Sequence, residues 1–359
     1  MTSYDHQYID RRTQNVQTET LLADDMISWM YDRVRERSGP LFKALTSSRC
    51  SRLLAWLQYD VSRQVQPARL GQAVRSLKIN SDEFVKDINR MHTFREVFER
   101  QIRYWDCRPM RQEEDRIVSP SDARMLIGSF SKTSGLCLKE KFFDFDELLG
   151  REHPQWRSIF RGGDFAVFRL TPDKYHYNHT PVSGYVADAY DLSGQYHSCN
   201  PSATVQMVNP LSKNRRSVTV LDTDGLDGTG VGYVAMIEIA ALMIGDIVQC
   251  YSDVRYDAPK PVKIGLHVKK GQPKSLFRPG SSTTVLIFEK NRIQFSPDIR
   301  QNLHRQDASS RYSLGFDIPL VETDVQVRSE IGYRAIRNHD EFCPSGMLGV
   351  TGGRPSGFC

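Results

Sequence analysis

Hydrophobic residues in the first third of the chain recur at the spacing of amphipathic helices. The periodic pattern predicts a helical N-terminal region over residues 21–110, after a polar and mobile segment over 1–20. Ser38-Gly39-Pro40 ends the first run. The three stripes are Leu21, Leu22, Met26, Ile27, Met30 and Val34; Leu53, Leu54, Leu57 and Val61; and Phe84, Val85, Ile88, Met91, Phe94 and Phe98.

The pattern changes after Arg108-Pro109, where short runs of Val, Ile, Phe and Tyr alternate with Gly, Pro, Asn and Asp. Such runs predict strands of a mainly antiparallel sheet. The chain is therefore expected to be an α+β protein, with a β-rich domain over 111–333 and a loose tail over 334–359. The predicted strands cover 116–118, 125–128, 165–170, 217–221, 233–239 and 262–266.

Composition and charge narrow the class of protein. The chain has 359 residues, with 48 basic and 43 acidic side chains and a net charge of +5, which is too balanced for nucleic-acid binding but compatible with an anionic membrane surface. No apolar stretch is long enough to span a bilayer, and the polar start is not a secretory signal. The seven scattered cysteines lack a CxxC pair, so we expect reduced thiols in a cytoplasmic protein.

A turn of small residues leads into a strand near the C-terminal end. Residues 277–284 read FRPGSSTT and continue directly into the apolar run VLIFE. A serine in such a turn is well placed to attack the carbonyl group that precedes it, because Gly280 tolerates a strained backbone. The same composition is also ordinary for a loop, so this segment alone does not identify a site.

Two histidines and an aspartate are the other candidates for chemistry. His176 and His179 form an HxxH pair, but no third ligand lies nearby, so we predict no metal. They are either an acid/base pair or two half-exposed loop histidines. Asp122 ends the run SPSD, and it either forms a turn or orients a histidine as in a catalytic triad. The spacing leaves these alternatives open.

Several motifs in order resemble the phosphatidylserine decarboxylase family, over about residues 45–335. Residues 168–184, FRLTPDKYHYNHTPVSG, resemble the family's RLAPxDYHRxHxPVxG, its most diagnostic segment. Residues 119–123 resemble its SPVDG, with Ala123 in place of glycine. Further similarities are found at Phe94–Arg100 with Arg108-Pro109, at Phe143–Gly150, at Asn200-Pro201, at Asn214-Arg215, and at Glu322–Gly332, which is similar to the type II branch.

The resemblance implies an enzyme, a carboxy-lyase with a covalent pyruvoyl cofactor that it makes by cutting itself. Asp122 and His179 would activate the serine, which converts the preceding peptide bond to an ester. Elimination then leaves two associated chains and a pyruvoyl group at the new N-terminus. That group forms a Schiff base with a substrate amine and draws electrons from the bond to carbon dioxide. His176 is the candidate acid that protonates the carbanion.

Two bonds are candidates for the cut. Alignment from Phe277 places it between Gly280 and Ser281, whereas alignment from Phe288 places it between Ser281 and Ser282. An extra residue within the strand would reverse the facing of every later side chain, whereas one in the turn costs little. We therefore favour Ser282, which divides the chain into residues 1–281 and 282–359.

The resemblance implies decarboxylation of phosphatidylserine to phosphatidylethanolamine, with carbon dioxide released. The stripe of Leu53, Leu54, Trp56 and Leu57 could serve as a peripheral membrane contact, or it is an ordinary core-facing helix. A soluble decarboxylase of a free, aromatic amino acid is the alternative, favoured by the departures from the family motifs at Tyr177-Asn178, Ala123 and Pro279. A non-catalytic scaffold is a third reading, against which the retained Asp122, histidines and serines argue. The resemblance also permits a homo-oligomer.

Overall fold

A ten-stranded sheet forms the frame of the protein. The computed structural model describes residues 5–21, 24–34, 38, 40, 42, 45–47, 65–131, 143–207, 210–242, 246–280 and 282–335. Among these, the ladders of the sheet are antiparallel except where β1 meets β15. Its strands, in spatial order, are β11 (His267–Val268), β7 (Gly184–Leu192), β8 (Arg216–Asp222), β9 (Tyr233–Ala240), β13 (Ser282–Phe288), β5 (Asp164–Leu170), β4 (Ala123–Ser129), β15 (Glu322–Val325), β1 (His6–Asp10) and β2 (Val16–Glu19). The α+β class and the antiparallel sheet are thus confirmed.

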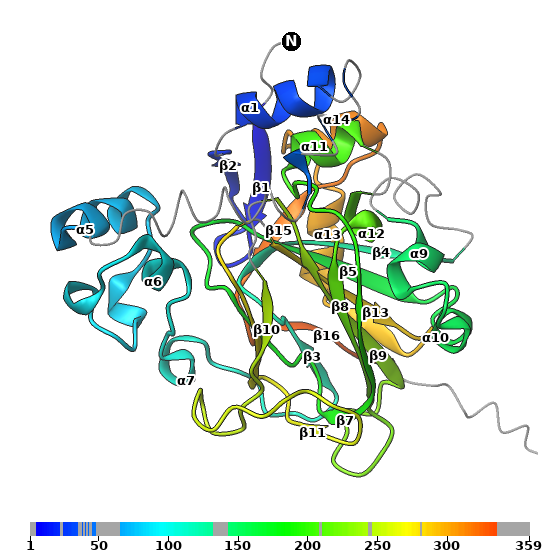
Figure 1. The fold of residues 1–359 in the computed structure, drawn as a ribbon. Coiled ribbons are helices and arrows are strands. Elements are labelled where there is room, and N and C mark those ends of the chain that lie inside the picture. The colour runs from blue at the N-terminus through cyan, green and yellow to red at the C-terminus, as the bar shows by residue number, and fades with distance from the viewer. Residues whose placement is uncertain are drawn as a thin grey trace, which may run out of the picture.

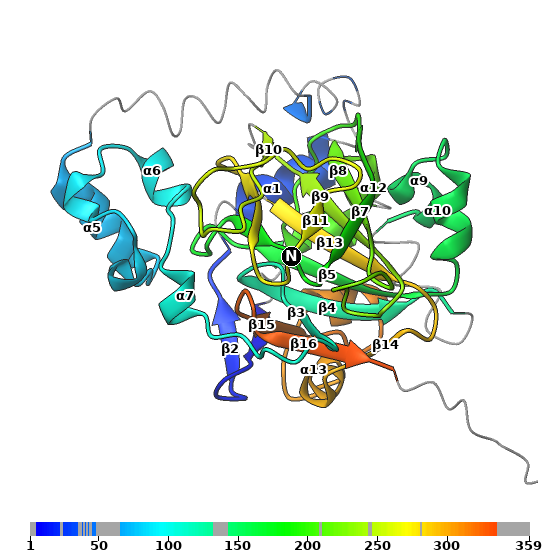
Figure 2. The same cartoon turned by 90° about the horizontal axis from the view of Figure 1, so that it is seen from below.

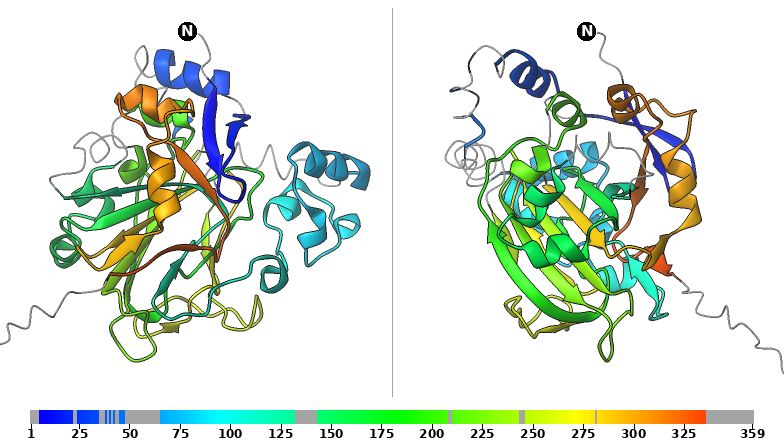
Figure 3. Two further views of the ribbon diagram at one scale, coloured as in Figure 1. Left: turned by 180° about the vertical axis from the view of Figure 1, so that it is seen from behind. Right: turned by 90° about the vertical axis from the view of Figure 1, so that its right-hand side faces the viewer.

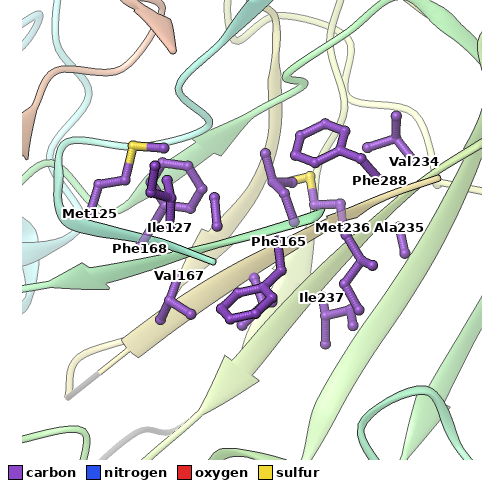
Figure 4. Close-up of a cluster of buried hydrophobic side chains, with 14 of the residues drawn as sticks. Met125, Ile127, Phe165, Val167, Phe168, Val234, Ala235, Met236, Ile237 and Phe288 are labelled. Carbon is purple, nitrogen blue, oxygen red and sulfur yellow. The ribbon is translucent and has the colours of Figure 1, made fainter. Parts of the chain in front are cut away.

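Strand β13 lies in the middle of this sheet and is buried along its whole length. Its seven residues pair with β5 on one side and with β9 on the other. An apolar run without alternation is typical of a strand that is covered on both faces. Phe165 of β5, Met236 of β9 and Phe288 of β13 are among the core side chains in Figure 4.

Two three-stranded sheets accompany the large one. The first consists of β10 (Ile247–Gln249), β12 (Pro273–Phe277) and β6 (Tyr177–His179), and the second of β14 (Ile293–Phe295), β16 (Glu330–Arg334) and β3 (Arg116–Val118). Strand β12 is followed at once by β13, so the chain leaves one sheet and enters another between residues 277 and 282. The small-residue turn identified in the sequence therefore lies at a junction between two sheets.

Short helices surround the sheets. The segment α5–α7 stands to one side of them in Figures 1 and 2, and its apolar residues form a second core with β6 and β12. Helix α13 packs against β4 and β15, on the side seen in Figure 3. The helices are α1 (Asp24–Trp29), η1 (Met30–Val34), α5 (Pro67–Ser76), η2 (Ser81–Glu83), η3 (Ile88–Arg90), α6 (Phe94–Phe98), α7 (Tyr104–Cys107), α9 (Phe145–Leu149), α10 (Pro154–Ile159), α11 (Pro201–Gln206), α12 (Pro210–Lys213), α13 (Pro297–Leu303) and α14 (Arg311–Phe316). All helices in the described part of the chain are too short or too polar to cross a membrane.

The N-terminal segment differs from the mobile arm expected over residues 1–20. Strands β1 and β2 form a hairpin there, and β1 adds the hairpin to the large sheet by pairing with β15. Tyr8 lies opposite Glu322, more than three hundred residues later in the chain. Local polarity indicated a loose segment because the strand that orders it is so distant in sequence.

Two further expectations need correction. The stripe over 84–98 is not one helix but one 3-10 turn, η3, followed by the short helix α6, while Phe84 forms an isolated bridge with Ile102. Residues 262–266 form no strand, since Gly265 takes a φ of +84° in a turn and Ile264 is exposed. The described helices within residues 21–110 are short and separated by turns. The stripe over 53–61 and the tail beyond residue 335 lie outside the described residues.

Candidate active site

Ser282 is the first residue of β13 and is completely buried. It lies opposite Leu170 of β5 and Ala240 of β9. Its hydroxyl group has no hydrogen-bond partner among the described residues. An unsatisfied buried polar group costs about 1–3 kcal/mol, so its presence points to a functional role. Gly280, two residues earlier, has a φ of +145°, a conformation that side chains disfavour. Ser281, the alternative serine, lies outside the described residues.

His176 lies between β5 and β6, beside the start of the turn. Its carbonyl oxygen accepts a hydrogen bond from the backbone nitrogen of Phe277 at 3.0 Å, and its ring stacks on Phe98 with 3.6 Å between the ring centroids. Within the described part of the chain, neither ring nitrogen forms a hydrogen bond of ordinary geometry. Burial, and secondly the charge of Arg100, lowers the pKa of His176 to about 3. The ring is therefore neutral, with both nitrogens uncommitted.

His179 ends β6 and is held through both ring nitrogens. Nδ1 lies 2.9 Å from the carbonyl oxygen of Gly271, and Nε2 lies 3.0 Å from the hydroxyl group of Tyr175. Because a carbonyl oxygen can only accept, Nδ1 carries the proton and Nε2 accepts from Tyr175. Burial lowers the pKa of His179 to about 3. The surroundings thus fix one neutral tautomer.

Asp122 is an ionised carboxylate paired with Arg108. The guanidinium group donates from Nε to Oδ1 at 3.1 Å and from Nη2 to Oδ2 at 2.8 Å, and the backbone nitrogen of Val327 donates to Oδ1 at 2.7 Å. Burial alone would raise the pKa of Asp122, but the charge and hydrogen bonds of Arg108 outweigh it and lower the pKa. Asp122 is therefore a fixed negative charge.

The segments that carry Asp122 and His179 lie side by side. The backbone nitrogen of His179 donates to the carbonyl oxygen of Pro120 at 2.7 Å, and that of Val118 donates to Pro181 at 3.0 Å. The charge of Asp122 raises the pKa of His179, against the larger effect of burial. No hydrogen bond between described residues joins Asp122 to His179, or either of them to Ser282. The aspartate can therefore act on the histidine through its charge, without a direct contact.

A buried polar network beside Ser282 was not predicted from the sequence. Thr284, on the same face of β13 as Ser282, donates to the side-chain oxygen of Asn178 at 2.9 Å, and Asn178 donates to Ser275 at 3.2 Å. Ser275 contacts Glu238, which also forms an ion pair with Lys274 at 2.8 Å. Glu238 and Thr284 lie in the mainly apolar strands β9 and β13, so the sequence pattern did not indicate a polar network there. Asn178 was noted only as a departure from the family motif.

One group of side chains in the described residues has the composition of a metal site. His6, Glu19 and Glu322 bring their ligand atoms within 4.8 Å of one another. The guanidinium group of Arg169 contacts both carboxylates, at 2.6 Å to Glu19 Oε2 and 2.6 Å to Glu322 Oε2. A cation thus already occupies the position between them, and the group is a buried ion-pair cluster. His176 and His179 do not belong to it.

Comparison with known proteins agrees with the motifs. The sequence model of the phosphatidylserine decarboxylase family matches residues 94–310. A phosphatidylserine decarboxylase proenzyme of Fusobacterium nucleatum subsp. nucleatum is 27% identical over 305 residues, which cover 82% of this chain and 91% of the relative. Proteins of the same name from Chlamydia trachomatis serovar D and Clostridium tetani are 28% and 24% identical, covering 81% of this chain and 90% and 91% of their own lengths. The resemblance predicted from the motifs is confirmed.

Proposed function

The chain belongs to the phosphatidylserine decarboxylase family of carboxy-lyases, and from this premise we propose that it is the precursor of a pyruvoyl enzyme. In this proposal it cuts itself before Ser282 and then converts phosphatidylserine to phosphatidylethanolamine. The observation that carries the proposal is the hydroxyl group of Ser282, buried and without a described partner at the start of the central strand. A serine held in this way fits the position from which a pyruvoyl group would be made.

The cut begins with attack of Ser282 Oγ on the carbonyl carbon of residue 281. The Oγ–C bond forms, the peptide C–N bond breaks, and the proton of the hydroxyl group passes to the released nitrogen. His179 Nε2 is the proposed carrier of this proton, and the charge of Asp122 stabilises the imidazolium form in between. Elimination then removes the Cα proton of Ser282, breaks the Cβ–O bond and frees the carboxylate of residue 281. The enamine that is left takes up a proton at Cβ and becomes an imine. Water replaces the nitrogen, which leaves as ammonia.

The pyruvoyl group supplies an electron sink when it is present, which makes loss of carbon dioxide possible. The chain's own contribution is to hold the substrate and to move one proton. His176 is neutral and its ring nitrogens are uncommitted, so one nitrogen can accept a proton from water while the other delivers its own proton to the substrate carbon after carbon dioxide leaves. Phe98 fixes the plane of the ring by stacking on it.

The test is release of carbon dioxide by the purified full-length protein. Vesicles containing phosphatidylserine are compared with a panel of free amino acids, tryptophan and tyrosine included. We expect carbon dioxide and phosphatidylethanolamine from the vesicles, together with two chain fragments on denaturing electrophoresis. Turnover of a free amino acid without turnover of the lipid would replace the proposed substrate. An uncut chain that releases no carbon dioxide would refute the proposal as a whole.

A further inference from the structure

A cleft of about 220 Å³ lies next to the candidate active site. The β1–β2 turn, the residues that follow α5, and the segment after α6 surround it; these elements lie close together in Figure 3. Asp122, Arg108 and Tyr175 form part of its wall. Tyr175 precedes His176 directly and donates to His179, so the cleft adjoins both histidines. Its volume suits a polar headgroup, since pockets for drug-sized ligands measure about 300–1,000 Å³.

Arg100 lines this cleft and is 5% exposed. Its guanidinium group donates to two carbonyl oxygens, that of Val97 at 3.1 Å and that of Asp173 at 2.6 Å. None of the ion pairs in the described part of the chain includes Arg100. Burial lowers the pKa of Arg100 to about 10, which still leaves the group charged at neutral pH. Its Cζ also lies 5.5 Å from the centroid of the Phe84 ring. A buried cation with only carbonyl and aromatic partners is costly, and a bound anion would offset that cost.

Four of the five carboxylates that line the cleft have a basic partner. Arg108 holds Asp122 and Glu83, at 2.8 and 2.9 Å, and Lys174 holds Asp324 at 2.7 Å. Lys174 also lowers the pKa of Asp173, against the larger effect of its burial. At the mouth, Asp10 accepts hydrogen bonds from the backbone nitrogens of the β1–β2 turn.

Two exposed bases add positive charge at the mouth of the cleft. Arg12 and Lys78 line the cleft there, and the ion pairs between described residues include neither of them. The cleft thus has three basic side chains without a carboxylate partner among the described residues, namely Arg100 at its base and Arg12 and Lys78 at its mouth. The surplus charge favours an anionic ligand.

We propose that this cleft binds a phosphate group, namely the phosphodiester of the phospholipid headgroup, with Arg100 as its buried contact. The proposal rests on the proposed function and specifies how its substrate is recognised. A guanidinium fork matches the geometry of phosphate oxygens. A carboxylate is the less suitable ligand, because holding it by a charged contact stabilises the ground state against loss of carbon dioxide. The phosphate carries no bond that changes in the reaction, so it can be held tightly throughout.

Binding can be measured without turnover in the full-length Ser282→Ala protein. Titration calorimetry is carried out with glycerophosphoserine, inorganic phosphate and L-serine. We expect the first two to bind and Arg100→Gln to weaken both by about 10- to 100-fold, the equivalent of one or two charged hydrogen bonds. Arg90→Gln, which removes an exposed charge outside the cleft, is the matched control and should leave both affinities unchanged.

A second variant guards against a folding defect in Arg100→Gln. Arg12→Gln/Lys78→Gln changes exposed side chains only, and it should weaken phosphate binding by a few fold, more at low salt than at high salt. Absence of phosphate binding, or equal affinity in the parent protein and in both cleft variants, would overturn the proposal. Loss of L-serine binding alone in Arg100→Gln would assign the arginine to the carboxylate and would equally overturn it.

Turnover by the processed enzyme separates the two proposals. With phosphatidylserine vesicles, Arg100→Gln should raise KM by about tenfold or more and change kcat less, and free phosphate should compete with the lipid. If phosphate binds but the parent protein releases no carbon dioxide from the lipid, the proposed function fails and the phosphate site stands. If the lipid is decarboxylated and Arg100→Gln leaves KM unchanged, the site fails and the function stands.

Discussion

Arg108 donates two hydrogen bonds to Asp122, from Nε to Oδ1 at 3.1 Å and from Nη2 to Oδ2 at 2.8 Å, and both side chains are buried. Both oxygens of the carboxylate are thereby engaged by a cation. The aspartate is kept ionised and in one orientation next to the segment that carries His179. Its influence on the histidine is therefore electrostatic, and it depends on an arginine that the sequence motifs did not assign to the site.

Loss of Arg108 should destabilise the fold strongly. In Arg108→Met, Asp122 stays buried without its counter-charge, and we expect the free energy of unfolding to fall by about 3–5 kcal/mol. Arg111→Gln is the control, because Arg111 is largely exposed and its loss should change stability by less than about 0.5 kcal/mol. Urea unfolding of both variants on the uncut Ser282→Ala background measures the difference. Equal losses would show that the buried pair does not contribute in this way.

The two serines of the turn should behave differently when each is replaced. Ser282→Ala removes the attacking hydroxyl group, so we expect a single chain of 41.1 kDa by intact mass. Ser281→Ala retains that hydroxyl group and should still yield fragments 1–281 and 282–359. The opposite result, with Ser281→Ala uncut and Ser282→Ala cut, would move the scissile bond to the one after Gly280.

The two histidines should separate self-cleavage from turnover. His179→Ala removes the proposed proton carrier, so its precursor should stay uncut. His176→Ala should still be cut, while its decarboxylation rate falls by about 100-fold or more, the usual contribution of a general acid. Electrophoresis reports the first step and carbon dioxide release the second. His304→Ala, a change at an exposed position far along the chain, should affect neither. Normal processing of His179→Ala would remove its assigned role.

Acid should destabilise the uncut Ser282→Ala protein over a defined range. Burial lowers the pKa of both His176 and His179 to about 3, whereas an unfolded chain gives about 6.5. Each histidine therefore contributes stability that is complete above pH 6.5 and is lost as the pH falls toward 3. From pH 7.0 to 5.5 the pair should cost about 2.5 kcal/mol of unfolding free energy. Chemical unfolding across this range measures how the free energy of unfolding changes with pH. In His179→Gln, the loss of unfolding free energy between pH 7.0 and 5.5 should be about half as large. An unchanged loss would contradict a neutral buried His179.

The two chains should remain together after the cut. Strand β13, which starts the small chain, pairs along its full length with β5 and β9 of the large chain, and β15 pairs with β1 and β4. Separation would break these ladders and expose the core. Gel filtration of the cut protein should therefore give one species containing both fragments, and only denaturant should release them. Elution of free fragments in buffer would contradict the arrangement.

Much of the β-rich domain could be predicted from the sequence, because its strands are short apolar runs between turn residues. Five of the six predicted runs coincide with β3, β4, β5, β8 and β9. The hairpin of β1 and β2 could not be predicted in this way, since its partner β15 lies at the other end of the chain. The prediction of one helix over 84–98 was wrong for another reason. The apolar residues of this run share a core with β6 and β12 but lie on several short elements, and their spacing in the sequence happens to match that of a single helix.

The candidate site was predicted in part. Resemblance to the family singled out Asp122, His176, His179 and Ser282, all of which are buried, and the assignment of their roles stays a prediction. The motifs gave no role to Arg100 or Arg108 and did not indicate the contact of Tyr175 with His179. These depend on contacts between segments far apart in sequence, which spacing cannot reveal.

If the chain is cut before Ser282 as proposed, the central position of β13 requires that folding precede the cut. The strand that begins at Ser282 is enclosed by β5 and β9, which both precede it in the chain, so these strands have to be paired with it before the serine is held in place. Under the proposed self-cleavage, maturation would be a check on folding, because a misfolded copy would lack the geometry needed to cut itself. Every molecule cut in this way would also carry its two chains in equal number, since both would come from one polypeptide that was already folded.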